Sequence, residues 1–130
     1  MRLGVTRAAL ERMYAAARDS APEECCGLLL GREAIEEIRP AANVASDPCR
    51  RFEIDPQTLV DAHRAARADG AAVIGYYHSH PTGPATPSAT DRAMAASDGK
   101  VWAIIGEDGV TFWRDDEDGF VSLSYTVEDR

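Results

Sequence analysis

One stretch of sequence is the best guide to the fold: Gly75-Tyr-Tyr-His-Ser-His-Pro-Thr-Gly-Pro-Ala-Thr-Pro-Ser-Ala-Thr-Asp91. In it an apolar run ends in polar residues, and a proline-rich loop follows. If residues 73–80 are extended, His78 and His80 lie two positions apart and project from the same face of the strand. The residues after the loop look like the start of a helix, which would bring Asp91 back towards the two imidazoles. Three ligands for one ion would then meet at the end of the strand.

The ligand types in this stretch favour zinc in a catalytic role. Two histidines and one carboxylate leave one corner of a tetrahedral zinc ion open for water, whereas structural zinc sites use all four positions. Each half of the pattern also has a simpler interpretation. Ser88 and Asp91 fit a capping box at a helix start, and a His-x-His pair is often only two polar residues at a sheet edge. The combination within one short segment favours the metal site.

The same residues resemble the signature of a known family. The run His78-Ser79-His80-Pro81, the seven residues between His80 and Ser88, and the Ser88-x-x-Asp91 pair are similar to the motif of the JAMM (MPN-plus, Mov34-type) zinc metallopeptidases. That motif also has a glutamate just before a small apolar strand. Here the segment Pro22–Gly31 supplies it, and the matching residue is Glu24. The resemblance extends over nearly the whole chain.

The resemblance implies a zinc-dependent peptidase or isopeptidase with one zinc ion per chain, held by His78, His80 and Asp91. Glu24 would be the general base that takes a proton from the attacking water and returns it to the leaving amine. Ser88 would donate a hydrogen bond to the oxyanion of the tetrahedral intermediate. If Ser88 also caps the helix, the two roles compete for one hydroxyl group.

The resemblance further suggests a substrate class. Compact relatives of this kind are proposed to cut beyond the C-terminal Gly-Gly of ubiquitin-like or sulfur-carrier proteins, and such a tail could enter a narrow groove as an added strand. Two alternatives remain open from the sequence. One is a non-catalytic binding module of the same fold for a ubiquitin-like partner, and the other is a zinc ion that serves only folding.

Length and charge limit the other possibilities. The 130 residues predict a single domain, 1–130, and the formal net charge of −8 argues against nucleic acid as a partner. No apolar stretch approaches the length of a membrane span, so we expect a cytoplasmic protein without membrane contact, either a monomer or a homodimer. Three cysteines without a Cys-x-x-Cys pair indicate neither a disulfide framework nor a thiolate zinc site.

The order of apolar and polar residues predicts an α/β fold with a mixed sheet flanked by about three helices. The resemblance implies the same, a sandwich akin to that of the cytidine deaminases. Zinc deaminase activity itself is not favoured, because the chain has no His-x-Glu and its Pro48-Cys49 lacks a second cysteine three positions on. The expected helices are 6–20, 56–70 and 88–97, and the expected strands are 24–31, 34–44, 51–55, 71–78, 101–106, 110–114 and 120–127.

Overall fold

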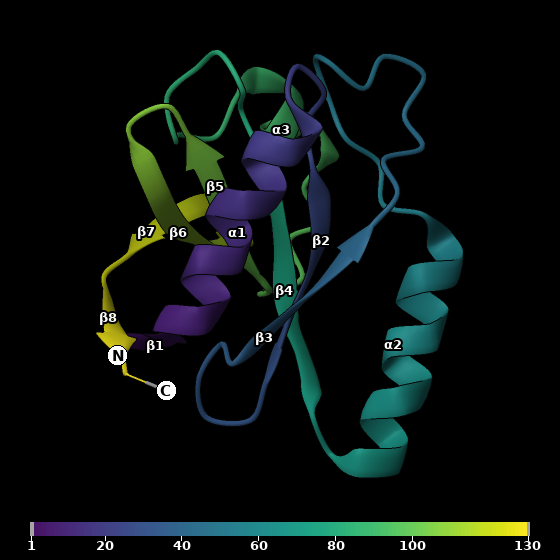
Figure 1. Cartoon of the computed structure of the whole chain (residues 1–130), viewed down its shortest axis with the longest axis vertical. Coiled ribbons are helices and arrows are strands. Elements are labelled where there is room, and N and C mark those ends of the chain that lie inside the picture. The colour runs from purple at the N-terminus through teal and green to yellow at the C-terminus, as the bar shows by residue number, and fades with distance from the viewer. Residues whose placement is uncertain (1, 130) are drawn as a thin grey trace.

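The computed structural model describes residues 2–129 and contains a mixed six-stranded sheet with strand order β3-β2-β4-β5-β6-β7 (Figure 1). Strands β4 and β5 are parallel, and the other neighbours in this sheet are antiparallel. In chain order the elements are β1 Leu3–Thr6, α1 Arg7–Ser20, β2 Cys26–Gly31, β3 Glu37–Ala41, α2 Pro56–Asp69, β4 Ala72–Ser79, α3 Ala89–Met94, β5 Val101–Gly106, β6 Gly109–Asp116, β7 Gly119–Leu123 and β8 Tyr125–Glu128. The predicted α/β class, with a mixed sheet and three helices, is confirmed.

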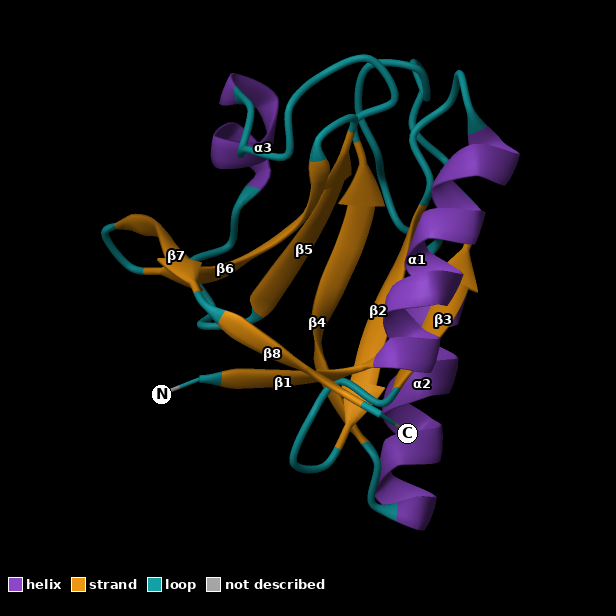
Figure 2. Cartoon of the chain, turned by 60° about the vertical axis from the view of Figure 1, so that its left-hand side comes forward, coloured by secondary structure: helices purple, strands orange, loops and turns teal. Residues whose placement is uncertain are grey.

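The two longer helices, α1 and α2, cover opposite faces of the sheet. The central strands are therefore buried on both sides. Alternate residues of a strand point to opposite faces, and β2 is buried along its whole length. Leu29 packs in one cluster with Met13 of α1, whereas Leu28 packs in another with Ala62 of α2. Helices α1 and α2 therefore lie on opposite faces (Figure 2). Paired residues share a face, so the register Cys26↔His78 places His78 on the α2 side.

Local sequence signals explain where the longer helices begin and end. Thr6 caps α1 by accepting a hydrogen bond from the Ala9 N–H. Asp55 caps α2, Pro56 occupies its first turn, and Gly70 ends it in the left-handed conformation with φ of 86°. These boundaries agree with the prediction to within one residue.

Four expected elements differ from the structure in kind or by more than two residues at an end. The segment 51–55 is not a strand and forms only an isolated bridge between Asn43 and Ile54. The strand expected over 120–127 is divided at Ser124 into β7 and β8, and β8 leaves the large sheet to pair with β1, which the prediction lacked. The third helix ends at Met94, earlier than expected, and the strand expected over 34–44 is limited to β3.

Strand β4, which leads to the two histidines, lies very close to its neighbour β5. A Cβ atom on Gly75 would collide with the backbone of Val101, so only glycine allows this spacing. Strand β4 then runs to the end of the molecule where α3 lies, opposite the terminal strands β1 and β8 (Figures 1 and 2). Among the helices of residues 2–129, none combines the length and the apolar character needed to cross a membrane.

Candidate functional site

The C-terminal end of β4 carries both histidines on one side, as the sequence predicts. His78 is fully buried in the strand, and His80 follows directly after it, held by a hydrogen bond of 2.8 Å from its backbone N–H to the Ile105 carbonyl. Parallel pairing with β5 thus continues one residue beyond the strand end. This pairing fixes the backbone of His80, from which the second imidazole extends.

Asp91 reaches the histidines from the first turn of α3. A capping box forms here: the Ser88 N–H donates to Asp91 Oδ2 at 2.9 Å, and the Asp91 N–H donates to Ser88 Oγ at 3.0 Å. The carboxylate is buried, with an exposed fraction of 4%. The capping interpretation of this pair is therefore correct, and it places Asp91 against the histidines at the same time.

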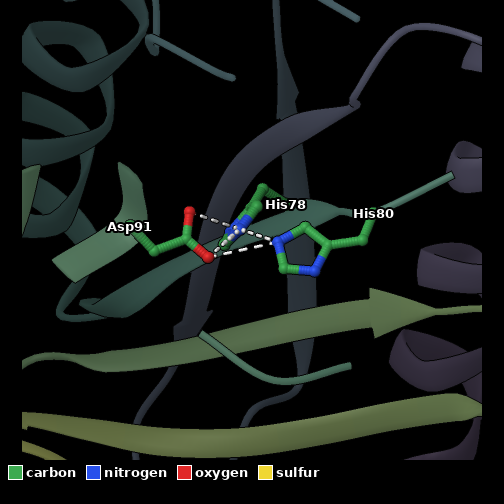
Figure 3. Close-up of side chains that lie close together, drawn as sticks. All are labelled: His78, His80 and Asp91. Carbon is green, nitrogen blue, oxygen red and sulfur yellow. Dashed lines mark hydrogen bonds and ion pairs between the residues drawn. The ribbon is translucent and has the colours of Figure 1, made fainter. Parts of the chain in front are cut away.

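The three side chains converge on one point (Figure 3). The two Nε2 atoms lie 3.1 Å apart, and each lies 3.1 Å from the Asp91 carboxylate. Zinc bonded to nitrogen and oxygen at about 2.0–2.1 Å in tetrahedral geometry requires ligand separations of about 3.3 Å. The triangle in this structure has nearly that size, so the spacing of the two imidazoles and the carboxylate suits one zinc ion.

Hydrogen bonds and burial shift the pKa values of the three side chains in different directions. His80 Nδ1 donates to the Pro84 carbonyl at 2.8 Å. Burial alone would lower the pKa of His80, but its hydrogen bonds to Asp91 and Pro84 raise it, so binding of zinc would displace the proton on Nε2. Burial lowers the pKa of His78 and so favours its neutral ring. Burial alone would raise the pKa of Asp91, but hydrogen bonds from both histidines hold it below its usual value. Neutral imidazole and ionised carboxylate are the forms that bind zinc.

Aromatic residues form the wall behind the cluster. The ring of Phe52 stacks on His78, with centroids 4.3 Å apart and an interplanar angle of 17°. Trp102 of β5 contacts the same imidazole edge to face at 5.6 Å. No signal in the sequence indicated the contact with Phe52, because its segment was expected to be an ordinary strand. These rings exclude water from one side of the site and fix the orientation of His78.

Glu24 lines a cleft that also contains His80 of the cluster. It precedes β2, whose first residue pairs with His78, and it lines a cleft of about 370 Å³ together with His80 and Ser88. The side chain is buried, and Oε1 has no hydrogen-bond partner within residues 2–129. Burial raises the pKa of Glu24 to about 7, because its effect exceeds the opposing attraction of His80. A carboxyl group with this pKa can both accept and release a proton near neutral pH.

The raised pKa predicts how metal-free protein responds to pH. In the unfolded chain the Glu24 carboxyl group ionises near its ordinary value of 4.5, whereas in the folded chain it ionises near 7, so folding stability falls as pH rises through this interval. Glutamine carries no charge, and we expect metal-free Glu24→Gln to be more stable than the native protein at pH 8. Urea unfolding at pH 4 and pH 8 checks this. Equal stability differences at both pH values would contradict the assigned burial effect.

The Ser88 hydroxyl caps α3 as an acceptor and keeps its O–H group as a donor. It accepts the Asp91 N–H through a lone pair, and a hydroxyl group retains one O–H donor when it accepts. Ser88 also lines the cleft beside Glu24. Capping uses only a lone pair of this hydroxyl group, so the expected competition with donation of its O–H into the cleft does not follow from the cap.

The remaining histidine and the cysteines lie outside the cluster. His63 is exposed on α2, and the group of converging ligands within the described residues contains only His78, His80 and Asp91. Cys25 and Cys26 are buried, Cys49 is exposed, and all three are free thiols. The converging donors in this part of the chain are thus nitrogen and oxygen atoms.

Comparison with known proteins gives a consistent result. The family described as prokaryotic homologs of the JAB domain matches residues 6–116. The chain is 36% identical over 137 residues to a desampylase from Haloferax volcanii, and the match covers 98% of this chain and 97% of that protein. It is 38% identical over 112 residues to a probable TtuB-protein conjugate cleaving protease from Thermus thermophilus, covering 83% of this chain and 72% of that protein.

Solved structures of other proteins are also similar to this chain. A protein from Desulfitobacterium hafniense is 28% identical and superposes with a TM-score of 0.86, covering 98% of this chain and 94% of that one. A JAB1/MPN domain protein from Archaeoglobus fulgidus, 20% identical, has the same fold with a TM-score of 0.62, covering 95% and 96%. The resemblance found in the sequence motifs is confirmed, and the chain belongs to the family of prokaryotic homologs of the JAB domain.

Proposed function

We propose that this chain is a zinc-dependent isopeptidase that cuts after the C-terminal tail of a ubiquitin-like or sulfur-carrier protein. The observation that carries the proposal is the convergence of His78, His80 and Asp91 at 3.1 Å, with His80 and the buried residue Glu24 lining one cleft. The relatives support the substrate class, because their names describe a desampylase and a protease that cleaves protein conjugates. The proposed unit is a single domain, 1–130, with one zinc ion per chain.

In this proposal His78, His80 and Asp91 hold the ion. Zinc, when bound, supplies a Lewis acid that polarises a carbonyl group and lowers the pKa of water to about 7. Phe52 and Trp102 keep the inner side of the site free of water. The cleft on the outer side, lined by His80 and Ser88, is where the scissile amide would lie.

Glu24 carries a proton from the attacking water to the leaving amine. Its carboxylate accepts a proton from the attacking water and then gives it to the nitrogen of the leaving amine, so that an amine leaves and a carboxylic acid remains. A pKa of about 7 suits both steps, since the group is neither a very weak base nor a very weak acid at neutral pH. The Ser88 O–H donates to the developing oxyanion, a contribution of about 3 kcal/mol in sites of this kind.

Ser88→Ala tests the oxyanion donor separately from the metal. The substitution removes the hydroxyl but no proposed ligand, and the Ser88 N–H still donates to the Asp91 carboxylate, so zinc should bind while kcat falls by about 10²-fold. Steady-state kinetics with the zinc content of the same sample measure both effects. A native kcat in the zinc-loaded variant would limit Ser88 to its role as a helix cap.

The test of the function is cleavage of a ubiquitin-like protein joined through its Gly-Gly terminus to a lysine. We expect purified protein to contain zinc in a ratio of one per chain and to release the ubiquitin-like protein. A chelator should stop cleavage while the circular dichroism spectrum stays that of a folded protein, and added zinc should restore cleavage. Size-exclusion chromatography of the same sample distinguishes a monomer from a homodimer.

Other outcomes would select the alternatives. Tight binding of the tail without hydrolysis of a panel of conjugates would favour the non-catalytic module. Unfolding on removal of zinc would mean that the ion serves folding. A zinc-loaded protein that neither binds nor cuts any ubiquitin-like protein would overturn the proposed substrate class.

A further inference from the structure

The peptide bond that follows Glu24 is held in an unusual way. Its carbonyl accepts a hydrogen bond from Asn43 Nδ2 at 3.0 Å, and its N–H, which belongs to Cys25, donates to Ser79 Oγ at 2.8 Å. Both polar atoms of this peptide group are thus bound by side chains and not by a neighbouring strand. Regular antiparallel pairing of β2 with β4 begins only at Cys26.

Ser79 connects this peptide to the strand that carries the histidines. It lies between His78 and His80 but points to the opposite face, where it is buried with an exposed fraction of 1%. Its own N–H donates to the Cys25 carbonyl at 3.1 Å, so Ser79 and Cys25 are joined by two hydrogen bonds. Through this single residue the backbone beside Glu24 is tied directly to the backbone between the two histidines.

Asn43 connects the same peptide to the loop 43–53. Besides the Glu24 carbonyl, its amide NH₂ group donates to the Arg51 carbonyl at 3.1 Å, and its Oδ1 accepts the N–H groups of Ala45 and Glu53, each at 3.1 Å. Donors facing carbonyls and an acceptor facing N–H groups fix the orientation of the amide. Asn43 is the only asparagine in the chain, and its side chain carries all of these contacts.

We propose that Asn43 and Ser79 are positioning residues that clamp the Glu24–Cys25 peptide and so set the place of the Glu24 carboxyl group relative to the histidines. The inference rests on the proposed role of Glu24 as the proton carrier. Glu24 Oε1 has no hydrogen-bond partner among residues 2–129, so no hydrogen bond to this oxygen from the described residues holds the carboxyl group, and its backbone contributes to its position. Displacement of a catalytic group by about 1 Å costs on the order of 10²-fold in rate.

The experiment compares Ser79→Ala, Asn43→Asp and the double variant in the zinc-loaded protein. Aspartate keeps the acceptor of Asn43 but replaces its donors with a charge that repels the carbonyls. We expect each single variant to lower kcat by about 10- to 100-fold while KM and zinc affinity stay unchanged. Because both residues hold one peptide group, the double variant should be close to the more impaired single variant, not to the product of the two losses.

Thr6→Ala is the matched control. Thr6 is also a buried hydroxyl residue that accepts a backbone N–H, at 3.1 Å from Ala9, but it lies at the start of α1 away from the cleft. The variant should lose stability as Ser79→Ala does and keep its kcat. A native kcat in Ser79→Ala, or a loss confined to KM or zinc affinity, would overturn the clamp.

Amide hydrogen exchange makes the clamp testable without catalysis. The Cys25 amide should exchange faster in Ser79→Ala than in the native protein or in Thr6→Ala, because it loses its acceptor. If the native protein cleaves no conjugate, the proposed function fails on that result alone. Faster exchange at Cys25 would then still support the clamp, and unchanged exchange would overturn it.

Discussion

Glu24→Gln is expected to lower kcat by about 10²- to 10⁴-fold, the range in which general acid–base groups contribute. Glutamine has nearly the shape of glutamate but cannot accept the proton of water or return it to the leaving amine. Zinc should remain bound, since the three proposed ligands come from β4, the residue after it, and α3. The measurement is single-turnover cleavage of a ubiquitin-like conjugate, with zinc content determined on the same sample.

Glu23→Gln provides the control for this experiment. Glu23 is adjacent in sequence and exposed, so its replacement removes the same charge without changing the cleft. It should cut at the native rate. A zinc-loaded Glu24→Gln variant that also cuts at the native rate would remove Glu24 from the mechanism, and another group would have to carry the proton.

Asp91→Asn should abolish tight zinc binding and, with it, cleavage. An amide oxygen is a weaker zinc ligand than a carboxylate, and the burial that surrounds Asp91 makes the loss of its charge decisive for a divalent ion. Asparagine can still accept the Ser88 N–H, so we expect α3 to persist. Isothermal titration with zinc and far-ultraviolet circular dichroism separate these two effects.

Asp61→Asn is the control for the loss of a carboxylate. Asp61 lies on the exposed surface of α2, where it accepts a hydrogen bond from the Gln57 side chain, so the substitution should change neither zinc affinity nor cleavage. Native zinc affinity in Asp91→Asn would show that the aspartate serves only the capping box of α3.

The parts of the fold that follow from local signals were predictable. The caps at Thr6 and Asp55 and the glycine at position 70 act within a few residues, and the boundaries of α1 and α2 followed from them. The shared direction of His78 and His80 was predictable as well, because residues two apart in a strand point to the same face. The convergence of these histidines with Asp91 is found in the structure, while the catalytic roles stay predictions.

The parts that depend on distant partners were not predictable. β1 has only four residues, and its partner is β8 at the other end of the chain. The segment 120–127 alternates continuously, so nothing in its pattern shows that Ser124 divides it between two sheets. Asn43 and Phe52 have roles only because the loop folds back onto Glu24 and His78. A single asparagine in a loop carries no signal of this contact in the sequence.

Selection for a folded helix alone would preserve Ser88 and Asp91, because their capping box stabilises α3 whether or not a metal is bound. Selection for stability alone would not preserve Glu24, because burial disfavours its charged form and a neutral residue at this position would stabilise the folded chain. A descendant that lost catalysis would therefore be expected to lose its glutamate first and its Ser-x-x-Asp pair last. In distant relatives, the glutamate is thus a better indicator of activity than the serine and aspartate.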